Sequence, residues 1–476
     1  MSILLINPSG GYHHEYPPLG LLYIASVLRD LGRTVSFLDE GALVEPAERF
    51  LDAFNTSRPK YVGLTLYTTN LFRAYEIIGR IRERAPDTII IVGGPHATAL
   101  PEYTLQECPL IDFLVAGEGE ITLTELLANL DAGGDGKNIR GLYVRTETKE
   151  DGIAFTGERE YIADLDALPF PAHDLVNLDA YQKNPISLGK RVGVLITSRG
   201  CPYNCTFCNK AVFKSITRRR SPGSVIREIR WLIDTSAIDE IYFQDDLFAL
   251  DRHWLGEFTR LLRQNNIRLP WRMRARVDIL REEDYRALKE VGCYLIQFGV
   301  ESGDDEILMD INKQITTRQV AEAFAMARHQ GLQTYGFFIF GHRLDTYETI
   351  VRSFALAKRI RCDFTSFFLL VPFPGTDVYT YLSDDARRDW KRIQYMNWNK
   401  GLEPLSICAI PGNELKLFEE QVNMEYFGRI AYLWYNVFSA ARPRLIRLKF
   451  RWFFAMTVQK VLSQVLGRPR IFRLHV

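Results

Sequence analysis

The sequence predicts an α/β protein made of two successive strand-and-helix arrays and a mostly helical C-terminal region. Two observations indicate this fold class. Short apolar runs alternate with longer amphipathic segments through residues 1–140 and again through residues 191–385, and such alternation is typical of parallel sheets covered by helices. A length of 476 residues with 47% apolar and 25% charged residues also fits two or three domains with substantial cores.

Residues 1–140 are expected to form a Rossmann-like, doubly wound domain with a mainly parallel sheet. The first helix is the clearest case, because Pro17 and Pro18 stand at its start and Gly32 follows its last residue, Leu31. The expected strands are residues 3–6, 34–38, 61–66, 88–92 and 113–116, and the other expected helices are residues 46–55, 71–85 and 122–130.

The loops that follow three of these strands are short and rich in small residues. They are Tyr67-Thr68-Thr69-Asn70, Gly93-Gly94-Pro95-His96 and Gly117-Glu118-Gly119. Sheets of this kind bind ligands at the carboxyl ends of their strands, and glycines let the backbone approach a large flat ligand closely. No G-x-G-x-x-G follows the first strand, so a dinucleotide site is not predicted.

Residues 141–190 are expected to form a connector, because charged and turn residues lead into the proline-bounded segment 165–171. Residues 191–385 then repeat strand and helix, which predicts a partial (β/α)6 barrel with its site at the carboxyl ends of the strands. The expected strands are residues 192–196, 240–243, 271–275, 295–299, 334–339 and 363–370, and the expected helices are residues 222–234, 251–264, 282–291, 317–330 and 347–359.

Three cysteines, Cys201, Cys205 and Cys208, follow the first barrel strand at a C-x3-C-x2-C spacing. Thiolates spaced this closely on a loop can share one soft metal centre. A structural zinc site normally has a fourth protein ligand, but no second C-x2-C or histidine pair follows at the usual distance. Three ligands suit a [4Fe-4S] cluster that keeps one iron open. Three unrelated buried thiols are the alternative interpretation.

In this loop the chain resembles the radical S-adenosylmethionine (SAM) superfamily, whose members hold a [4Fe-4S] cluster with the same spacing and bind SAM at the open iron. Phe207, directly before the last cysteine, also matches. The resemblance implies that polar residues after the barrel strands hold SAM beside the cluster, although such residues also commonly cap helices. These residues are Asp245, Asp246, Arg274, Arg276, Glu301 and Ser302.

Residues 1–140 resemble the cobalamin-binding domain that precedes many radical SAM domains. The helix start at 17–20, the stretch 92–96 and the turn 117–120 carry this resemblance, which implies that the three loops named above contact cobalamin. A domain that has lost its corrin is the alternative.

The domain lacks the D-x-H-x-x-G motif whose histidine binds cobalt from below in some cobalamin proteins. The lower face of cobalt is therefore expected to have no histidine ligand, and His96 is expected to bond to backbone rather than to cobalt. One match lies in the barrel at 251–256, where we expect Asp251 to cap a helix.

The last part of the chain, residues 386–476, differs in composition. After Glu425 there is no acidic residue, whereas arginine, lysine and aromatic residues alternate to the C-terminus. A pair of amphipathic helices on a membrane surface would have this composition. A helical lid over the barrel would also have it, and RNA binding is a third option without a recognisable module.

Charge and cysteine usage limit the remaining classes. The formal net charge of +1 gives no overall field that selects nucleic acid. The four cysteines outside the loop are expected to be buried free thiols in a reducing cytoplasm; they are Cys108, Cys293, Cys362 and Cys408. A strand starts the chain in place of a signal peptide, and no uncharged apolar run reaches the ~18 residues of a membrane span.

The resemblance implies a cobalamin-dependent radical SAM enzyme. Its reduced cluster would split SAM into methionine and a 5′-deoxyadenosyl radical, the radical would take hydrogen from an unactivated carbon, and cobalamin would deliver a methyl group. One alternative is ring closure, ring contraction or oxidation without methylation, as in anaerobic magnesium-protoporphyrin cyclase. A second alternative is a sensor of cluster or cobalamin without turnover.

No side chain is assigned a catalytic role, because the cofactors carry the chemistry. Tyr67, His96 and Tyr335 are candidates for tuning the cofactors. The expected partners are a hydrophobic or anionic small-molecule substrate and an electron donor such as flavodoxin or ferredoxin.

Overall fold

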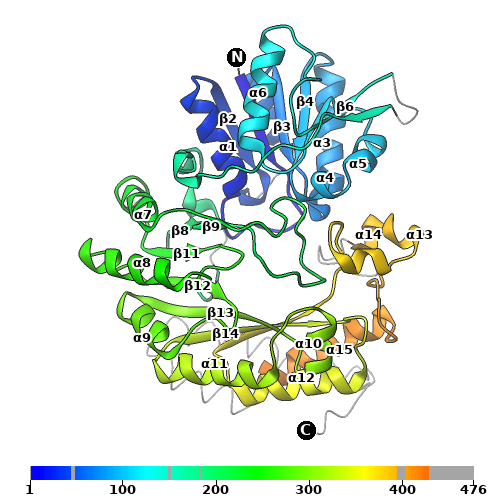
Figure 1. Cartoon of the computed structure of the whole chain (residues 1–476). Helices are drawn as coiled ribbons and strands as arrows, with labels where there is room; N and C mark the ends of the chain where they lie inside the picture. The colour runs from blue at the N-terminus through cyan, green and yellow to red at the C-terminus, as the bar shows by residue number, and fades with distance from the viewer. Residues whose placement is uncertain (1, 44–48, 148–151, 182–183, 394–401, 428–476) are drawn as a thin grey trace.

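The computed structural model describes residues 2–43, 49–147, 152–181, 184–393 and 402–427. An N-terminal α/β domain stands above a second α/β domain, and a few helices follow the second domain (Figure 1). This arrangement confirms the predicted fold class.

The N-terminal sheet has seven strands in the order β2-β1-β3-β4-β5-β6-β7, and the first five are parallel. The strands are β1 (Ser2–Asn7), β2 (Thr34–Asp39), β3 (Tyr61–Thr65), β4 (Ile89–Gly93), β5 (Phe113–Val115), β6 (Leu142–Arg145) and β7 (Ile153–Phe155). The helices are α1 (Leu19–Asp30), α2 (Arg49–Ser57), α3 (Leu71–Arg84), α4 (Pro95–Ala99), α5 (Pro101–Glu107) and α6 (Gly119–Asp131).

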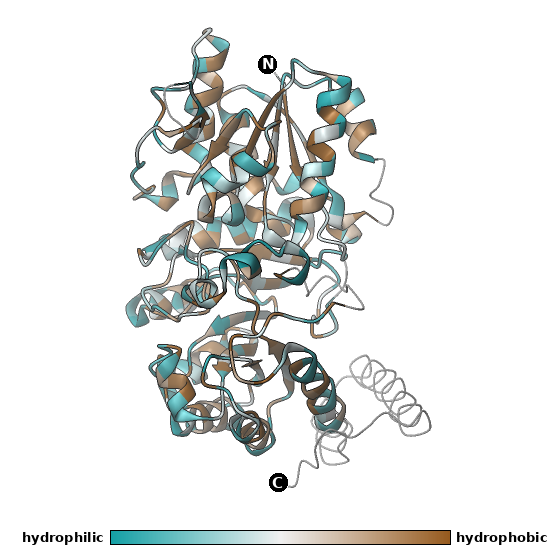
Figure 2. Ribbon diagram, turned by 90° about the vertical axis from the view of Figure 1, so that its right-hand side faces the viewer, coloured by the Kyte–Doolittle hydropathy of each residue, from teal (hydrophilic) through white to brown (hydrophobic). Residues whose placement is uncertain are grey.

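This sheet is buried on both faces, as a doubly wound fold requires. On one face, Phe50 of α2 and Ile77 of α3 pack with Val62 of β3. On the other face, Leu28 of α1 and Leu126 of α6 form a separate cluster. The strands accordingly appear as a uniformly hydrophobic layer between amphipathic helices in Figure 2.

The antiparallel strands β6 and β7 differ from the prediction, which placed residues 141–155 in the connector. Leu142 and Val144 are buried and alternate with the partly buried Tyr143, and Ile153 on β7 is buried as well. This alternation is typical of a hairpin on a sheet edge, and the charged residues between the two strands hide it in the sequence. The connector that follows holds three short 3-10 turns, η3 (Leu165–Ala167), η4 (His173–Leu175) and η5 (Leu178–Ala180).

The second domain is a six-stranded parallel sheet in the order β15-β14-β13-β12-β11-β8. Its strands are β8 (Val192–Leu195), β11 (Glu240–Phe243), β12 (Trp271–Ala275), β13 (Cys293–Glu301), β14 (Gln333–Phe340) and β15 (Phe364–Leu369). Its helices are α7 (Pro222–Ser236), α8 (Arg252–Gln264), α9 (Glu282–Glu290), α10 (Asp305–Asp310), α11 (Thr317–His329) and α12 (Tyr347–Ile360). A small ladder pairs β9 (Ser198–Arg199) with β10 (Arg218–Arg219).

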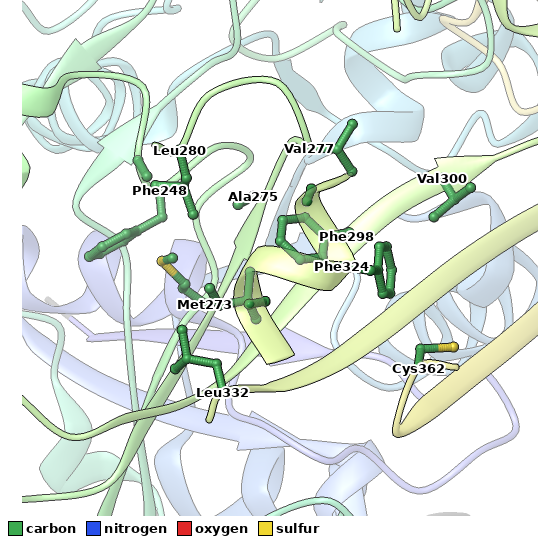
Figure 3. Close-up of a cluster of buried hydrophobic side chains, with 14 of the residues drawn as sticks. Phe248, Met273, Ala275, Val277, Leu280, Phe298, Val300, Phe324, Leu332 and Cys362 are labelled. Carbon is green, nitrogen blue, oxygen red and sulfur yellow. The ribbon is translucent and has the colours of Figure 1, made fainter. Parts of the chain in front are cut away.

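The strands of this partial barrel follow one another in sequence order, and the helices pack on one face only. Figure 3 shows part of the resulting core, where Met273 and Phe298 of the strands gather with Phe324 of α11. Asp251 caps α8 by accepting a hydrogen bond from the backbone N–H of Trp254, as predicted. The opposite face of the sheet is left to line the barrel.

The chain returns to the N-terminal domain after the barrel. The elements here are η6 (Asp377–Tyr381), α13 (Asp384–Arg387), α14 (Trp390–Ile393) and α15 (Gly412–Phe427). Leu382, Trp390 and Ile393 join the same hydrophobic cluster as Val62 and Ile77 of the first domain, whereas α15 packs on the barrel. None of the helices in the described ranges is long and apolar enough to cross a membrane. The basic and aromatic stretch predicted as a membrane-surface helix pair or lid falls largely within 428–476, outside the described residues.

Candidate functional site

The cysteine loop begins where β8 ends, and a buried carboxylate fixes its start. Asp245, which follows β11, is 1% exposed and accepts hydrogen bonds from the backbone N–H and hydroxyl of Thr197 and from the hydroxyl of Ser198. Gly200 then has a φ of 81°, and a side chain there would collide with the carbonyl oxygen of Ile216. The first cysteine therefore leaves the barrel at a fixed place and direction.

The remainder of the loop is held by the neighbouring barrel loops. The guanidinium of Arg276 lies 3.6 Å from the centre of the Tyr203 ring and donates to the carbonyl of Lys313 at 2.7 Å. Asn312 donates to the carbonyl of Asn204 at 2.8 Å. The loop is therefore preorganised by contacts from several strands of the barrel.

The three loop thiols are free, with Cys201 and Cys205 partly buried and Cys208 exposed. Desolvation in the barrel mouth raises the pKa of Cys205 and raises that of Cys208 to about 11, although Cys208 still meets solvent. Metal binding deprotonates such thiols outright. Within the described ranges no three His, Cys, Asp or Glu side chains converge on a single ion. A cubane cluster does not require its three cysteines to meet at a single ion, because each cysteine sulfur binds a different iron.

The residues predicted to contact SAM divide into two groups. Asp246 and Arg274 are exposed side chains next to the loop. Burial raises the pKa of Asp246, although the charge of Arg274 and a hydrogen bond from the backbone N–H of Gly200 act to lower it. The guanidinium of Arg274 lies 5.7 Å from the ring centre of Tyr242. Both residues are exposed and therefore accessible to a ligand.

The others are committed to protein contacts. Asp245 and Arg276 hold the cysteine loop as described above. Glu301 has a φ of 66° at a bulge in β13, is 5% exposed, and pairs with Lys313 at 2.7 Å. Ser302 is buried against the hydroxyl of Ser353. The ammonium of Lys313 lies 5.9 Å from the ring centre of Phe207, so these residues form one structure behind the loop.

The three small-residue loops of the N-terminal domain lie together at the carboxyl ends of β3, β4 and β5. Gly93, Gly94, Pro95, Thr69 and Gly117 are partly exposed there. A side chain on Gly94, which has a φ of 99°, would approach the Thr65 hydroxyl to 2.7 Å. Glycine is therefore required at position 94 so that the loop after β4 can pack against the end of β3.

Tyr67 lies on this edge. The residue is 43% exposed, and the protein around its hydroxyl raises the pKa of that group. Thr68 and Asn70 are buried beneath it, and Asn70 donates to the carbonyls of Pro8 and Thr65.

His96 was expected to bond to backbone, but its buried ring bonds to a side chain instead. Its Nδ1 lies 2.9 Å from the Thr68 hydroxyl, and its Nε2 is buried without a hydrogen-bond partner. Trp390 of α14 covers the ring edge-on, with 5.1 Å between centroids. Burial lowers the pKa of His96 to about 4, so the imidazole is neutral, and neither nitrogen reaches open solvent.

A buried group of charges joins this edge to the cysteine loop. Arg199, the residue before Gly200, donates to Glu118 at 2.7 Å and to Glu120 at 2.5 Å. Arg218 on the paired strand β10 donates to Glu118 at 2.7 Å. Burial acts to raise the pKa of Glu118, but the hydrogen bonds from Arg218 and Arg199 outweigh it and the pKa is lowered.

Neither arginine was predicted from the sequence as a site residue, nor was Glu120, and Glu118 was predicted to contact cobalamin. In the structure the Glu118 carboxylate is taken up by Arg199, Arg218 and the backbone N–H of Ile162. The only available signal was an arginine directly before the Gly200–Cys201 turn. An ion cluster thus joins the cysteine loop to the loop after β5 at the edge of the N-terminal sheet. The side chains of this cluster are all 9% exposed or less.

Comparison with known proteins agrees with this architecture. The B12 binding domain family matches residues 10–127, and the Radical SAM superfamily matches residues 195–357. An uncharacterised methyltransferase of Pyrococcus horikoshii is 34% identical over 387 residues, which are 81% of this chain and 81% of that protein. The anaerobic magnesium-protoporphyrin IX monomethyl ester cyclase of Rubrivivax gelatinosus is 28% identical over 81% of this chain and 70% of its own length.

Among solved structures, the cobalamin-dependent SAM radical enzyme OxsB, determined with aqua-cobalamin and SAM bound, superposes with a TM-score of 0.71. The match covers 98% of this chain and 75% of that chain at 18% identity, so it establishes the fold alone. Together with the two domain matches and the Pyrococcus relative, the fold places the protein in a family: the chain belongs to the radical SAM superfamily, in the branch that carries an N-terminal B12-binding domain.

Proposed function

We propose that this protein is a cobalamin-dependent radical SAM enzyme that methylates an unactivated carbon of a small molecule. One observation carries the proposal. The cysteine loop at the mouth of the barrel is joined directly to the glycine-containing loops at the edge of the N-terminal sheet through Arg199, Glu118 and Glu120. A radical source and a methyl carrier would both have to reach one substrate, and the direct contact between the two proposed sites supports this.

The residues at these sites fit the three cofactors by their chemistry. Cys201, Cys205 and Cys208 would hold a [4Fe-4S] cluster, since three thiolates leave one iron open. Asp246 and Arg274 are charged, exposed side chains beside that loop, and they would meet the amino and carboxylate groups of SAM. Tyr67 and the glycine-lined loops after β4 and β5 would meet the corrin.

When bound, the cluster, SAM and cobalamin supply the radical and methyl-transfer chemistry that no side chain can supply. The protein itself would position these cofactors and enclose them. Arg276 and Asp245 fix the cysteine loop, Lys313 and Glu301 support Phe207 behind it, and the charged cluster of Arg199 fixes the distance between the two sites. Such preorganisation matters because small misplacements of reacting groups cost orders of magnitude in rate.

Methylation is favoured over the other reactions of this branch by the Pyrococcus relative, whose name describes a methyltransferase. The cyclase of Rubrivivax is a relative without that chemistry in its name, and a reaction without methyl transfer is therefore the second candidate. The chain's own residues are compatible with both, because both need the same cofactors.

The two candidates separate in one experiment. Anaerobically purified protein, reduced and supplied with SAM labelled in its methyl group, is incubated with small-molecule extract of the source cells. Label recovered in an organic product means methylation. Formation of 5′-deoxyadenosine without label transfer favours the second candidate, and absence of 5′-deoxyadenosine under strong reductant favours a sensor. A visible spectrum of the purified protein first establishes whether cluster and corrin are both present.

We expect the protein to work in a reducing cytoplasm with a small electron-transfer protein, such as flavodoxin or ferredoxin, as its electron donor. All seven cysteines are free thiols, which suits such a compartment. A contact with the membrane surface would involve residues 428–476. It is tested by comparing how the full chain and a chain without these residues bind to anionic vesicles.

A further inference from the structure

The barrel has a partly exposed aromatic wall on the face of the sheet opposite the helices. On β14 the buried Phe338 and Phe340 alternate with the partly exposed Tyr335 and Phe337. Phe368 on β15 is 40% exposed, whereas its neighbour Phe367 is buried in the helix-covered core. Exposed aromatic residues on one face of β14 and of the adjacent edge strand β15 indicate that this face is available to a ligand.

The rings of this wall form a nearly parallel series. Tyr335 and Phe337 stack with 4.5 Å between centroids at an interplanar angle of 26°, and Phe337 and Phe368 follow at 6.2 Å and 27°. The Tyr335 hydroxyl is satisfied by the Ser366 hydroxyl at 2.6 Å, so it makes no demand on a ligand. A flat ring would continue the series beyond Phe368, the most exposed member.

A buried polar group beside the wall points independently to a ligand. Gln297 on β13 is paired in register with Tyr335 on β14, and its side chain is on the same face because both residues are opposite to the core positions. Gln297 is 6% exposed, and its Oε1 is buried with no hydrogen-bond donor in the described part of the chain. Native proteins rarely leave such a group unsatisfied, so a ligand donor is the simplest partner.

Among the described residues, the wall is closed at the amino ends of the strands. At the amino ends of the strands, Ile186 and Leu188 of the connector pack against Leu295 and Tyr294. The Tyr16 hydroxyl accepts from the buried Arg272 at 2.5 Å and closes the same end. Beside the wall, Arg274 on β12 pairs in register with Gln297, and its charge acts on Asp246 after β11. The wall is thus continuous with the mouth of the barrel.

We infer that Phe337, Phe368, Tyr335 and Gln297 form the binding surface for the substrate's ring system, and that the substrate is a planar, mainly apolar, unsaturated ring compound with a hydrogen-bond donor on its edge. The inference rests on the proposed function for the reaction that this ligand undergoes, but not for its binding. Neutral groups line the wall, so an anionic group on the substrate would remain at the mouth near Arg274 or in solvent.

The test uses three tricyclic probes that differ in one property each: carbazole is planar with one N–H donor, fluorene is planar without a donor, and perhydrofluorene is saturated. Binding to anaerobic protein loaded with cluster, cobalamin and SAM, without reductant, is measured by equilibrium dialysis. Carbazole should bind more tightly than fluorene, and perhydrofluorene more weakly than both.

Substitutions assign the binding to the wall. Phe337→Leu and Phe368→Leu should each weaken the binding of carbazole and of fluorene about three- to tenfold, because ring–ring contacts are lost. Gln297→Leu should weaken carbazole but not fluorene. Phe72→Leu, at a surface position that is 46% exposed on α3, is the matched control and should change neither. The absorption spectrum of each variant shows whether its cofactors are retained.

Equal binding of the saturated probe, or affinities unchanged by both phenylalanine substitutions, would overturn the inference. Carbazole that binds only after residues 428–476 are removed would also overturn it, because that segment would then be the natural occupant. If carbazole binds as expected while labelled methyl groups never reach a product, the proposed function fails and the binding surface stands. If labelled methyl groups do reach a product while the wall variants bind carbazole as tightly as the unchanged protein, the proposed function stands and the binding surface fails.

Discussion

Replacing Arg199 by methionine tests the ion cluster that joins the two domains. The substitution keeps the length of an unbranched side chain but removes a guanidinium that is 4% exposed and is paired with two carboxylates, each 5% exposed. Glu118 retains Arg218, whereas the Glu120 carboxylate has no other hydrogen-bond partner among the described residues. The variant therefore leaves one buried, uncompensated negative charge.

Removing one partner of a buried pair costs about 3–5 kcal/mol, and the part borne by Glu118 is reduced by Arg218. We expect the free energy of unfolding of Arg199→Met to fall by about 3 kcal/mol or more, measured by urea denaturation of the cofactor-loaded protein with far-ultraviolet circular dichroism. The double variant Arg199→Met, Glu120→Gln carries a neutral amide in place of the stranded charge and should recover more than half of the loss.

A loss below about 1 kcal/mol would refute the reasoning, because that value is typical of exposed pairs. Failure of the Glu120→Gln rescue would refute it as well, since the cost would then come from packing rather than from charge. Tyr16→Phe is the control: it removes another hydrogen bond between the domains, to Arg272, and should gain nothing from Glu120→Gln.

Three further outcomes follow from the same structure. Cys205→Ala should abolish iron and sulfide binding in anaerobic reconstitution while cobalamin absorbance stays, as measured by metal analysis and visible spectroscopy; an unchanged iron content would count against the cysteine loop. Gly94→Ala, strained by its φ of 99° and by a contact of 2.7 Å with Thr65, should lower the free energy of unfolding by about 1–3 kcal/mol, and it should weaken cobalamin binding in dialysis. Glu118 has a folded-state pKa below its usual value of 4.5, so its contribution to stability is present above pH 4.5 and is lost as the pH falls through the folded-state pKa; Glu118→Gln should therefore flatten the acid side of the stability profile, and an unchanged profile would contradict this assignment.

The sequence predicted the order of elements well because each rests on a local pattern. Residues 240–243 and 271–275 are strands with the expected bounds, since short apolar runs between turn residues leave few alternatives. The hairpin of β6 and β7 was missed because its buried and exposed positions alternate over only a few residues, next to charged turns.

The site itself was harder to predict, because its contacts join residues that are far apart in the chain. The bond between Arg199 and Glu118 spans 81 residues, and no local pattern reports it. Strand-end position likewise could not separate Asp246, which is open to a ligand, from Asp245, whose carboxylate is used by Thr197 and Ser198. The cysteine loop could be proposed from the sequence because its three cysteines lie within eight positions of each other, and their binding of a cluster stays a prediction.

The return of the chain to its first domain has a consequence during synthesis. Trp390 and Ile393 complete a hydrophobic cluster whose other members include Val62 and Ile77, and Trp390 also donates from its indole nitrogen to Glu107 at 2.7 Å. A nascent chain that has emerged only through the B12-binding region would therefore expose an apolar patch until translation has passed the barrel. The hydrophobic cluster of the first domain can therefore be completed only after the ribosome has synthesised Trp390 and Ile393.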